Sequence, residues 1–264
     1  MIKLIASDLD GTILLNGAQS VDGSLINTVD KLVDMGYIFA PASGRQISSL
    51  KMLFKPIDDK LMYIAENGAL VKYKQKTIVK NVMDKELALD IIEDILRQPC
   101  CEVLVSGENV AYIKPKTEEY YNRMTKVVKY KTQMVDDFKD IKEDILKIAV
   151  CDLSGIDNSK DHFKEKWGNM ASAVVSGKLY LDFMASEVSK GHAMKQIQEY
   201  MGIETSECMA FGDNYNDIEM LDNVTHSYVM ENSSDDIKKH GKYICSKVED
   251  TLLDLLNITL KHKY

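Results

Sequence analysis

Apolar and amphipathic stretches alternate along the first part of the chain. Residues 2–6 form a short apolar run rich in β-branched side chains, which is typical of a buried strand. Apolar residues then recur at helical spacing over 25–33, and Gly36 supplies a stop signal. Further strands are expected at 37–40 and 62–65, with another helical pattern between them. The order is strand, helix, strand, helix, strand.

Polar residues follow each of these strands. The segments are Asp8-Leu9-Asp10-Gly11-Thr12, Ala42-Ser43-Gly44-Arg45 and Glu66-Asn67-Gly68. Alternating strands and helices predict an α/β fold with a doubly wound, Rossmann-like parallel sheet, whose ligands bind beyond the carboxyl ends of the strands. The three segments are therefore expected to converge on one crevice.

The pattern changes around Met83. The elements expected there are a helix at 85–96, a Tyr-rich helix near Tyr120, and strands at 102–106, 111–113, 147–151, 173–176 and 179–183. Strands and helices without polar strand ends predict an inserted α+β domain over 83–186. From Ser189 the alternation of helices and strands seen in the first part of the chain resumes, with a helix at 191–201 and a strand at 208–211. The expected core domain is thus discontinuous, comprising 1–82 and 187–264.

The polar segments favour phosphoryl transfer. Phosphate monoesters hydrolyse so slowly in water that an enzyme supplies up to roughly 10²¹-fold acceleration. A carboxylate is an established nucleophile for phosphoryl groups, and Asp8 is placed for that role after the first strand. Asp10, two residues later, is the candidate acid that protonates the leaving alkoxide and the base that then activates water.

A cation is expected beside the neighbouring carboxylates of Asp8 and Asp10. Two like charges about 4 Å apart repel by about 4 kcal/mol at an effective dielectric near 20, and a substrate phosphate adds to this. Mg²⁺ is the natural choice, because it binds carboxylates, waters and phosphate oxygens together. Asp213 offers a further carboxylate, with Asp217 one helical turn beyond it. The Lys190 ammonium, the Ser43 hydroxyl and the Gly44 N–H group can hold phosphate oxygens.

Four segments together resemble a known family. In order, Asp8-Leu9-Asp10-Gly11-Thr12, Ala42-Ser43-Gly44-Arg45, Ser189-Lys190-Gly191 and Gly212-Asp213-Asn214-Tyr215-Asn216-Asp217 are similar to the four motifs of the haloacid dehalogenase-like phosphatases. More closely, the chain resembles the Cof-type branch, in which an α/β cap is inserted between the second and third motifs. The resemblance covers essentially the whole chain.

The resemblance implies a role for each of these residues. Asp8 would be the nucleophile and Asp10 the acid/base, with Mg²⁺ held by the Asp8 carboxylate, the Asp10 carbonyl and Asp213. The implied phosphate contacts are the Leu9 N–H group, Ser43, Gly44, Lys190 and Asn216. Asp217 would orient Lys190 or a water on the metal. The implied substrates are sugar phosphates and related metabolites, including flavin mononucleotide or pyridoxal phosphate for some members.

The chain departs from the Cof-type pattern in two places. Met230-Glu231-Asn232 stands where Gly usually precedes Asn, and Asp182 stands where Glu is common. Both departures concern specificity and leave the chemistry of phosphoryl transfer unchanged.

Composition and charge favour small ligands as partners, and the resemblance implies small phosphorylated metabolites. The net charge of -8 argues against nucleic acid, and no apolar stretch approaches the roughly 18 residues of a membrane span. Five cysteines without a C-x-x-C pair, interpreted as small buried hydrophobes, and the lack of an export signal fit a reducing cytoplasm. The histidine spacing offers no zinc pair. A monomer or weak homodimer is expected.

Two other functions remain open at this stage. A sugar phosphomutase would pass the same aspartyl-phosphate group to a sugar hydroxyl if the cap excluded water. A catalytically silent protein that binds phosphorylated metabolites would keep the site without turnover. Dehalogenation is disfavoured, because that chemistry needs neither a second acid at Asp10 nor a magnesium carboxylate at Asp213.

Overall fold

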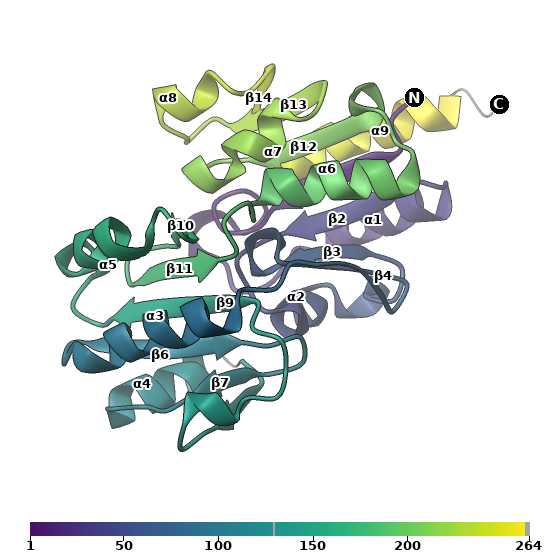
Figure 1. Ribbon diagram of the computed structural model, residues 1–264. Coiled ribbons are helices and arrows are strands. Elements are labelled where there is room, and N and C mark those ends of the chain that lie inside the picture. The colour runs from purple at the N-terminus through teal and green to yellow at the C-terminus, as the bar shows by residue number, and fades with distance from the viewer. Residues whose placement is uncertain (129, 262–264) are drawn as a thin grey trace. The chain divides into compact units, whose positions relative to one another are not determined.

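The computed structural model describes residues 1–128 and 130–261 and comprises two compact units. The core unit contains Met1–Ser43, Leu50–Val79 and Ser189–Tyr264, and the insert unit contains Gly44–Ser49 and Lys80–Val188 (Figure 1). The short segment 44–49 therefore belongs with the insert, although the sequence pattern did not single it out. The expected α/β fold class, with an α+β insert, is confirmed.

An eight-stranded sheet organises the core unit. Its order is β14 (Tyr243–Cys245), β13 (His226–Met230), β12 (Cys208–Gly212), β1 (Leu4–Asp8), β2 (Ile38–Ala42), β3 (Met62–Ala65), β4 (Leu70–Tyr73) and β5 (Lys76–Lys80). The strands from β14 to β3 are parallel, and β4 runs antiparallel to β3. Strand β1 thus lies in the middle of the sheet, between β12 and β2.

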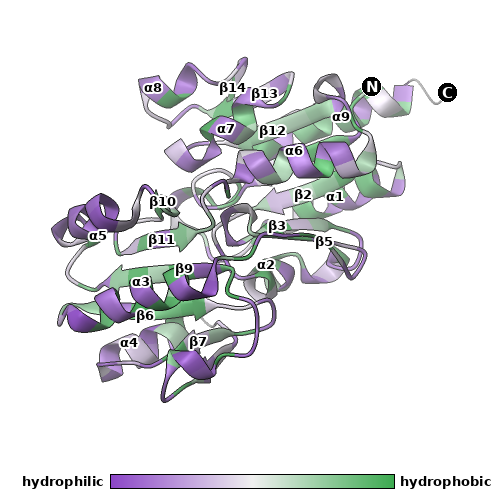
Figure 2. Ribbon diagram, in the orientation of Figure 1, coloured by the Kyte–Doolittle hydropathy of each residue, from purple (hydrophilic) through white to green (hydrophobic). Residues whose placement is uncertain are grey.

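Helices accompany the strands of this sheet. They are α1 (Gly23–Asp34), α2 (Ile47–Leu53), whose residues 47–49 are counted with the insert unit, α6 (Lys190–Met201), α7 (Ile218–Asp222), α8 (Asp235–Lys238) and α9 (Val248–Lys261). Helix α1 contacts α9, and α6 contacts α7. Apolar side chains of α6 and α7 belong to one buried cluster with Leu4, Ala6 and Ala40. Leu4, Ile5 and Ala6 of β1 are all fully buried, as expected for a central parallel strand, and the buried strands are among the most hydrophobic segments (Figure 2).

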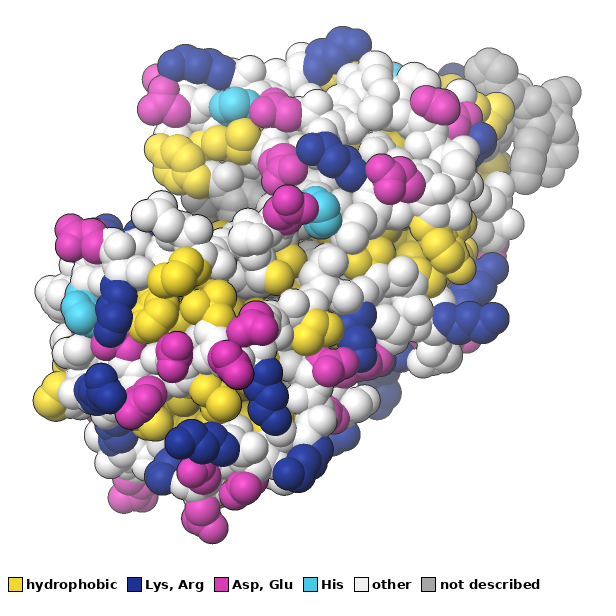
Figure 3. Space-filling model, viewed as in Figure 1, with side chains coloured by type: hydrophobic (Ala, Val, Ile, Leu, Met, Phe, Trp, Pro, Cys, Tyr) yellow, Lys and Arg dark blue, Asp and Glu magenta, His cyan; other side chains and the backbone are white. Residues whose placement is uncertain are grey.

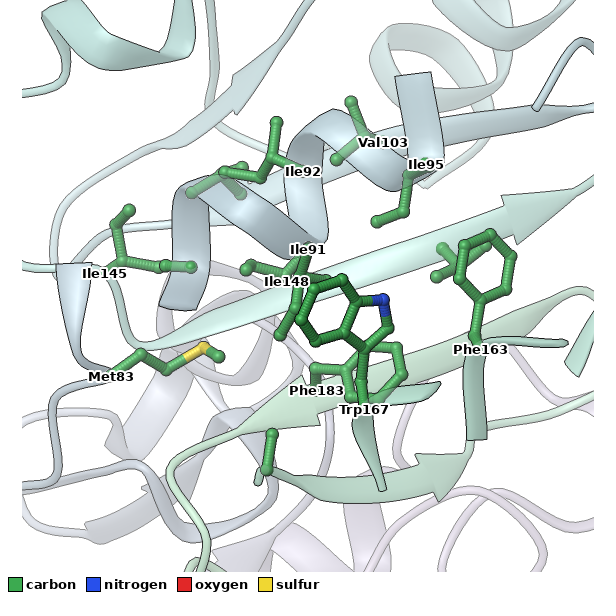
Figure 4. Packing of buried hydrophobic residues seen from close by; sticks show 14 of the residues in the cluster. Met83, Ile91, Ile92, Ile95, Val103, Ile145, Ile148, Phe163, Trp167 and Phe183 are labelled. Atoms are coloured by element: carbon green, nitrogen blue, oxygen red, sulfur yellow. The ribbon is translucent and has the colours of Figure 1, made fainter. Parts of the chain in front are cut away.

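A six-stranded sheet organises the insert unit. Its order is β10 (Ser172–Val175), β11 (Tyr180–Met184), β9 (Lys147–Asp152), β6 (Cys101–Ser106), β7 (Ala111–Ile113) and β8 (Thr132–Met134). Neighbouring strands are antiparallel except β7 and β8. Helices α3 (Lys85–Arg97) and α5 (Lys160–Trp167) join these strands in one apolar cluster, which includes Ile91, Ile95 and Trp167 (Figure 4). A second cluster contains Tyr120 of α4 (Glu118–Asn122).

Short single-turn helices complete the described chain. The 3-10 helices are Leu15–Gly17, Lys55–Ile57, Glu66–Gly68, Phe138–Asp140, Ile156–Asn158, Thr205–Glu207 and Tyr215–Asp217, and Arg123–Val127 forms a π-helical turn. Within 1–128 and 130–261, no helix combines the length and apolar character needed to cross a membrane. On the face shown in Figure 3, Lys and Arg side chains are interspersed with Asp and Glu.

The structure corrects several sequence-based details. Strand β1 covers Leu4–Asp8 instead of 2–6, so Asp8 is the last residue of the strand. The hairpin of β4 and β5 was not predicted, because its turn uses Lys74 and Gln75 at positive φ in place of the Asn-Gly pair that marks such turns. Cys100 is exposed, and Cys245 is only partly buried, so these two cysteines are not buried hydrophobes.

Candidate active site

Asp8 ends the central strand of the core sheet. Its backbone lies opposite Ala42 of β2, and its side chain is only 8% exposed. One carboxylate oxygen, Oδ1, lies 2.5 Å from the Lys190 Nζ atom. The other, Oδ2, is buried and accepts no hydrogen bond from any described residue. A buried carboxylate oxygen without a partner is costly, so Oδ2 is available for a ligand.

Lys190 reaches Asp8 from the first residue of α6. The helix begins at Ser189, whose hydroxyl accepts a hydrogen bond from the His192 N–H group at 2.9 Å. Besides Asp8, the Lys190 ammonium donates to Asp217 Oδ1 at 2.7 Å, and its side chain is 1% exposed. Burial opposes a charge on Lys190, but the Asp217 and Asp8 carboxylates outweigh it and raise its pKa above the usual value. Lys190 is therefore a fixed positive charge between two carboxylates.

Asp217 uses both of its carboxylate oxygens within the protein. Oδ1 accepts from Lys190, and Oδ2 accepts from the N–H groups of Asp213 and Asn214, each at 3.1 Å. The side chain is completely buried. Asp217 thus ties the turn after β12 to the ammonium of Lys190, which is the geometry expected of a residue that positions another.

Asp213 follows β12 and lies beside the turn after β1. Its Oδ1 atom accepts a hydrogen bond from the Thr12 hydroxyl at 2.8 Å. Gly11, with φ +99°, passes so close that a Cβ atom there would collide with the Asp213 carboxylate. Only glycine satisfies both the backbone angle and the space. The first sequence motif includes Thr12 but indicates no role for it. The hydrogen bond shows that Thr12 positions the Asp213 carboxylate.

Asp8, Asp213 and Asp217 form a group that can hold a cation. Each offers one carboxylate oxygen, and these atoms all lie within 4.8 Å of one another. Burial raises the pKa of the Asp8 carboxyl well above its usual value, against the effect of Lys190, and burial also raises the pKa of Asp213. A single ammonium faces three carboxylates in this group. A hard divalent cation with oxygen ligands fits that donor set.

Two asparagines connect the remaining loops of the core unit. Ser43 is buried, and its carbonyl accepts from the Asn67 N–H group at 3.0 Å. Asn216 Nδ2 donates to Asn67 Oδ1 at 3.5 Å. Gly68, with φ +102°, packs against the Ser189 carbonyl, where a Cβ atom would collide. The loops that carry Ser43 and Asn216 therefore both adjoin the Asn67 turn, which itself packs at the start of α6.

Three other predicted residues are placed differently. Asp10 lies two residues beyond Asp8 and is exposed, and its backbone forms a bridge with Leu14. Leu9 is fully buried, and its carbonyl accepts from Thr12 and Leu14. Gly44 belongs to the insert unit, where its carbonyl accepts from the Lys147 ammonium at 2.6 Å. The structure thus brings Asp8, Lys190, Asp213 and Asp217 together. The contact given for Gly44 lies within the insert unit.

Asp182, which stands where the Cof-type branch commonly has Glu, forms an ion pair with Lys147. Its Oδ2 atom lies 3.3 Å from the Nζ atom of Lys147, and both side chains are almost completely buried. Lys147 therefore contacts both Asp182 of β11 and the carbonyl of Gly44. Within the insert unit, this pair fixes the segment that follows Ser43.

Comparisons with known proteins identify similar sequences and structures. Residues 5–252 match the family model of haloacid dehalogenase-like hydrolases. The chain is 29% identical to the 5-amino-6-(5-phospho-D-ribitylamino)uracil phosphatase YbjI of Escherichia coli, over 99% of this chain and 97% of that protein.

Solved structures share the fold. A crystal structure from Eubacterium rectale has a TM-score of 0.87 and 28% identity, covering 96% of this chain and 99% of its own. The subclass IIB sugar phosphatase BT4131 is 17% identical with a TM-score of 0.79, covering 96% of this chain and 98% of its own, which is a likeness of fold alone.

Proposed function

The chain belongs to the haloacid dehalogenase-like hydrolases and is a phosphatase of that family, and we propose that it hydrolyses small phosphorylated metabolites through a phosphoryl group carried on Asp8. One observation carries the proposal. Asp8 lies buried at the end of β1, with Oδ1 fixed by Lys190 and Oδ2 accepting no hydrogen bond from the described chain. A carboxylate held on one side and free on the other is arranged to attack phosphorus.

In the first step Asp8 Oδ2 attacks the phosphorus atom of the substrate. A bond forms between Oδ2 and phosphorus while the bond from phosphorus to the leaving oxygen breaks. Asp10 gives its proton to that oxygen, so the product leaves as an alcohol. Lys190 shares the negative charge of the phosphoryl group during the transfer.

In the second step a water molecule attacks the phosphorus of the aspartyl-phosphate. Asp10, now a carboxylate, accepts a proton from this water, and the bond between Asp8 and phosphorus breaks. Inorganic phosphate forms and Asp8 is regenerated. Lys190 stays paired with Asp217 throughout, which keeps its ammonium in place.

The carboxylate group fits Mg²⁺. We expect the Asp8 carboxylate, the Asp10 carbonyl and Asp213 to hold the ion, with Thr12 fixing Asp213. When bound, Mg²⁺ supplies positive charge that allows a phosphate dianion to approach these carboxylates. Ser43, Asn216 and the N–H groups of Leu9 and Gly44 are proposed to contact the phosphate oxygens.

The substrate class follows from the relatives. The name of the Escherichia coli relative gives a phosphorylated ribitylamino-pyrimidine, and the substrate of BT4131 is named as a sugar phosphate. Both are phosphate monoesters of a polyhydroxylated carbon chain. We therefore propose phosphorylated sugars and sugar alcohols as substrates, with 5-amino-6-(5-phospho-D-ribitylamino)uracil as the first compound to assay.

A panel assay tests the proposal. Phosphate release is measured from this compound, from several sugar phosphates and from p-nitrophenyl phosphate, with Mg²⁺ and with chelator. Asp8→Asn should abolish release, whereas Asp254→Asn, an exposed position on α9, should leave it unchanged. Release at the wild-type rate by Asp8→Asn would refute the covalent route. Activation by a sugar bisphosphate without net phosphate release would instead identify a phosphomutase.

A further inference from the structure

A second cluster of metal-ligating side chains lies within the insert unit. Cys100, Cys101 and Asp152 each offer one ligand atom, and these atoms all lie within 4.8 Å of one another. None of the three has a role in the proposed phosphatase mechanism. We propose that this cluster binds a thiophilic divalent ion of the Zn²⁺ type. The proposal is independent of the phosphatase function.

The strand register creates this cluster. Cys101 is the first residue of β6, and it lies directly opposite Asp152, the last residue of β9, in the antiparallel pair. Cβ atoms of directly opposed residues are about 4.5–5.5 Å apart, with both side chains on the same face of the sheet. Cys100 precedes β6 in the turn that follows α3. Two ligands therefore come from one cross-strand pair and the third from the adjacent residue.

The distance between the sulfur atoms of Cys100 and Cys101 suits the binding of one ion. Their Sγ atoms lie 3.7 Å apart. Two thiolates bound to a tetrahedral Zn²⁺ ion at about 2.3 Å each are separated by about 3.8 Å. Little movement of either side chain is therefore needed to bind an ion between them.

Asp152 supplies a free carboxylate oxygen. Its Oδ1 atom accepts from the Ser154 N–H group at 3.0 Å and from the Ser154 hydroxyl at 2.6 Å. Its Oδ2 atom is buried and has no hydrogen-bond partner in the part of the chain that the structure describes. The whole side chain is 0% exposed. A coordinated cation would satisfy this oxygen, whose burial without a partner is otherwise unfavourable.

Lys116 fixes the backbone that carries the cysteines. Its ammonium donates to the carbonyls of Ile95 at 3.1 Å, Gln98 at 2.6 Å and Cys101 at 2.7 Å. These three bonds hold the end of α3 against the start of β6. The backbone that carries the two cysteines is thus held in place before an ion binds.

Access and ligand number complete the description of the site. Cys100 is exposed, so an ion can enter from solvent, while Cys101 and Asp152 are buried. With three protein ligands, a water molecule takes the fourth tetrahedral position. Burial raises the pKa of the Cys101 thiol to about 12, so the ion displaces a proton when it binds.

Cadmium titration of the full chain tests the proposal without measuring catalysis. Reduced protein is titrated with Cd²⁺ while the ultraviolet thiolate-to-cadmium absorption is followed, and Zn²⁺ is then added as competitor. The expected result is one ion per chain, displaced by Zn²⁺ but not by excess Mg²⁺. Cys100→Ser should abolish the absorption, and Asp152→Asn, which keeps an acceptor for Ser154, should weaken binding at least about 10-fold.

Two further variants make the result decisive. Cys208→Ser, at a buried cysteine of the core unit, should bind Cd²⁺ as the wild type does. Because Cys100 is exposed, Cys100→Ser should keep the wild-type circular dichroism and melting temperature even if a variant at Cys101 does not fold. Absence of the absorption in the wild type, or unchanged binding by Cys100→Ser and Asp152→Asn, would overturn the proposal.

Discussion

The Nζ atom of Lys190 lies 2.5 Å from Oδ1 of Asp8, and both side chains are buried. The two residues are 182 positions apart in the sequence. Lys190 also lies 2.7 Å from Asp217, so one ammonium neutralises part of the charge of two buried carboxylates. Removing this ammonium should affect both catalysis and stability.

Lys190→Met should lower kcat at least about 100-fold, because the phosphoryl group loses a positive charge in the transition state. The variant should also lose about 3–5 kcal/mol in free energy of unfolding, since a buried ion pair is broken from one side. Lys195→Met on the same helix is the control, because its ammonium pairs with Glu219 at the exposed surface. Steady-state kinetics and urea unfolding measure both effects. Equal behaviour of the two variants would contradict the role given to Lys190.

Thr12→Val should weaken the binding of Mg²⁺. The Thr12 hydroxyl donates to Asp213 Oδ1, and loss of such a bond to a metal ligand typically lowers metal affinity about 10–100-fold. The Mg²⁺ concentration for half-maximal activity should therefore rise by about this factor, with kcat nearly restored at saturating Mg²⁺. Thr259→Val on α9 serves as control. An unchanged Mg²⁺ dependence in Thr12→Val would mean that Asp213 does not hold the ion.

Comparison of Gly11→Ala with Gly17→Ala distinguishes the effect of backbone strain from that of a collision with Asp213. Both glycines have positive φ, +99° and +77°, where a side chain costs about 1–2 kcal/mol. No described atom lies within 4 Å of a Cβ atom built at Gly17, whereas a Cβ atom at Gly11 meets the Asp213 carboxylate. Gly17→Ala should therefore lose stability alone, and Gly11→Ala should lose Mg²⁺ affinity as well. Thermal unfolding and Mg²⁺ titration of activity distinguish the two, and similar Mg²⁺ dependence in both variants would argue against the close approach.

Asp94 should make the insert unit sensitive to acid. Burial opposes its charge, but the Trp167 indole N–H group at 2.8 Å and the Lys166 ammonium at 2.9 Å outweigh burial and lower its pKa. A lowered folded-state pKa stabilises the protein above the unfolded value of about 3.9, and this contribution is lost as pH falls through the folded value. Asp94→Asn should therefore reduce stability near neutral pH, and the difference from wild type should shrink in acid.

The single tryptophan reports this transition directly. Trp167 is the only tryptophan in the sequence and donates to Asp94, so its fluorescence follows unfolding of the insert unit. Urea titrations at several pH values below neutral give the stability difference between wild type and Asp94→Asn. A difference that stays constant through the acid range would show that the Asp94 charge is not responsible.

Much of the core fold could be predicted from local patterns. Apolar runs followed by polar segments identified β1, β2 and β3, because parallel strands are buried on both faces and present their ligands at one end. The strand limits were less certain, and β1 ends two residues later than expected. Helix α5 was missed, since only Phe163 and Trp167 of its eight residues are buried.

The site was predictable in its residue types and less so in its contacts. Motif spacing alone singles out Asp8, Lys190 and Asp213. The hydrogen bond from Thr12 to Asp213 and the turn at Asn67 depend on how distant segments meet, which local pattern does not record. The cysteine cluster was missed for the same reason, because strand register sets Cys101 against Asp152.

The discontinuous core unit has a consequence for synthesis on the ribosome. Strand β1 is translated about two hundred residues before β12, which is one of its two neighbours in the sheet. Until then one edge of β1 lacks its partner, and an apolar strand with a free edge is prone to pair with other chains. Most of the insert, Lys80–Val188, is contiguous and can form before β12 appears. We therefore expect nascent chains that stall before β12 to depend most strongly on chaperones.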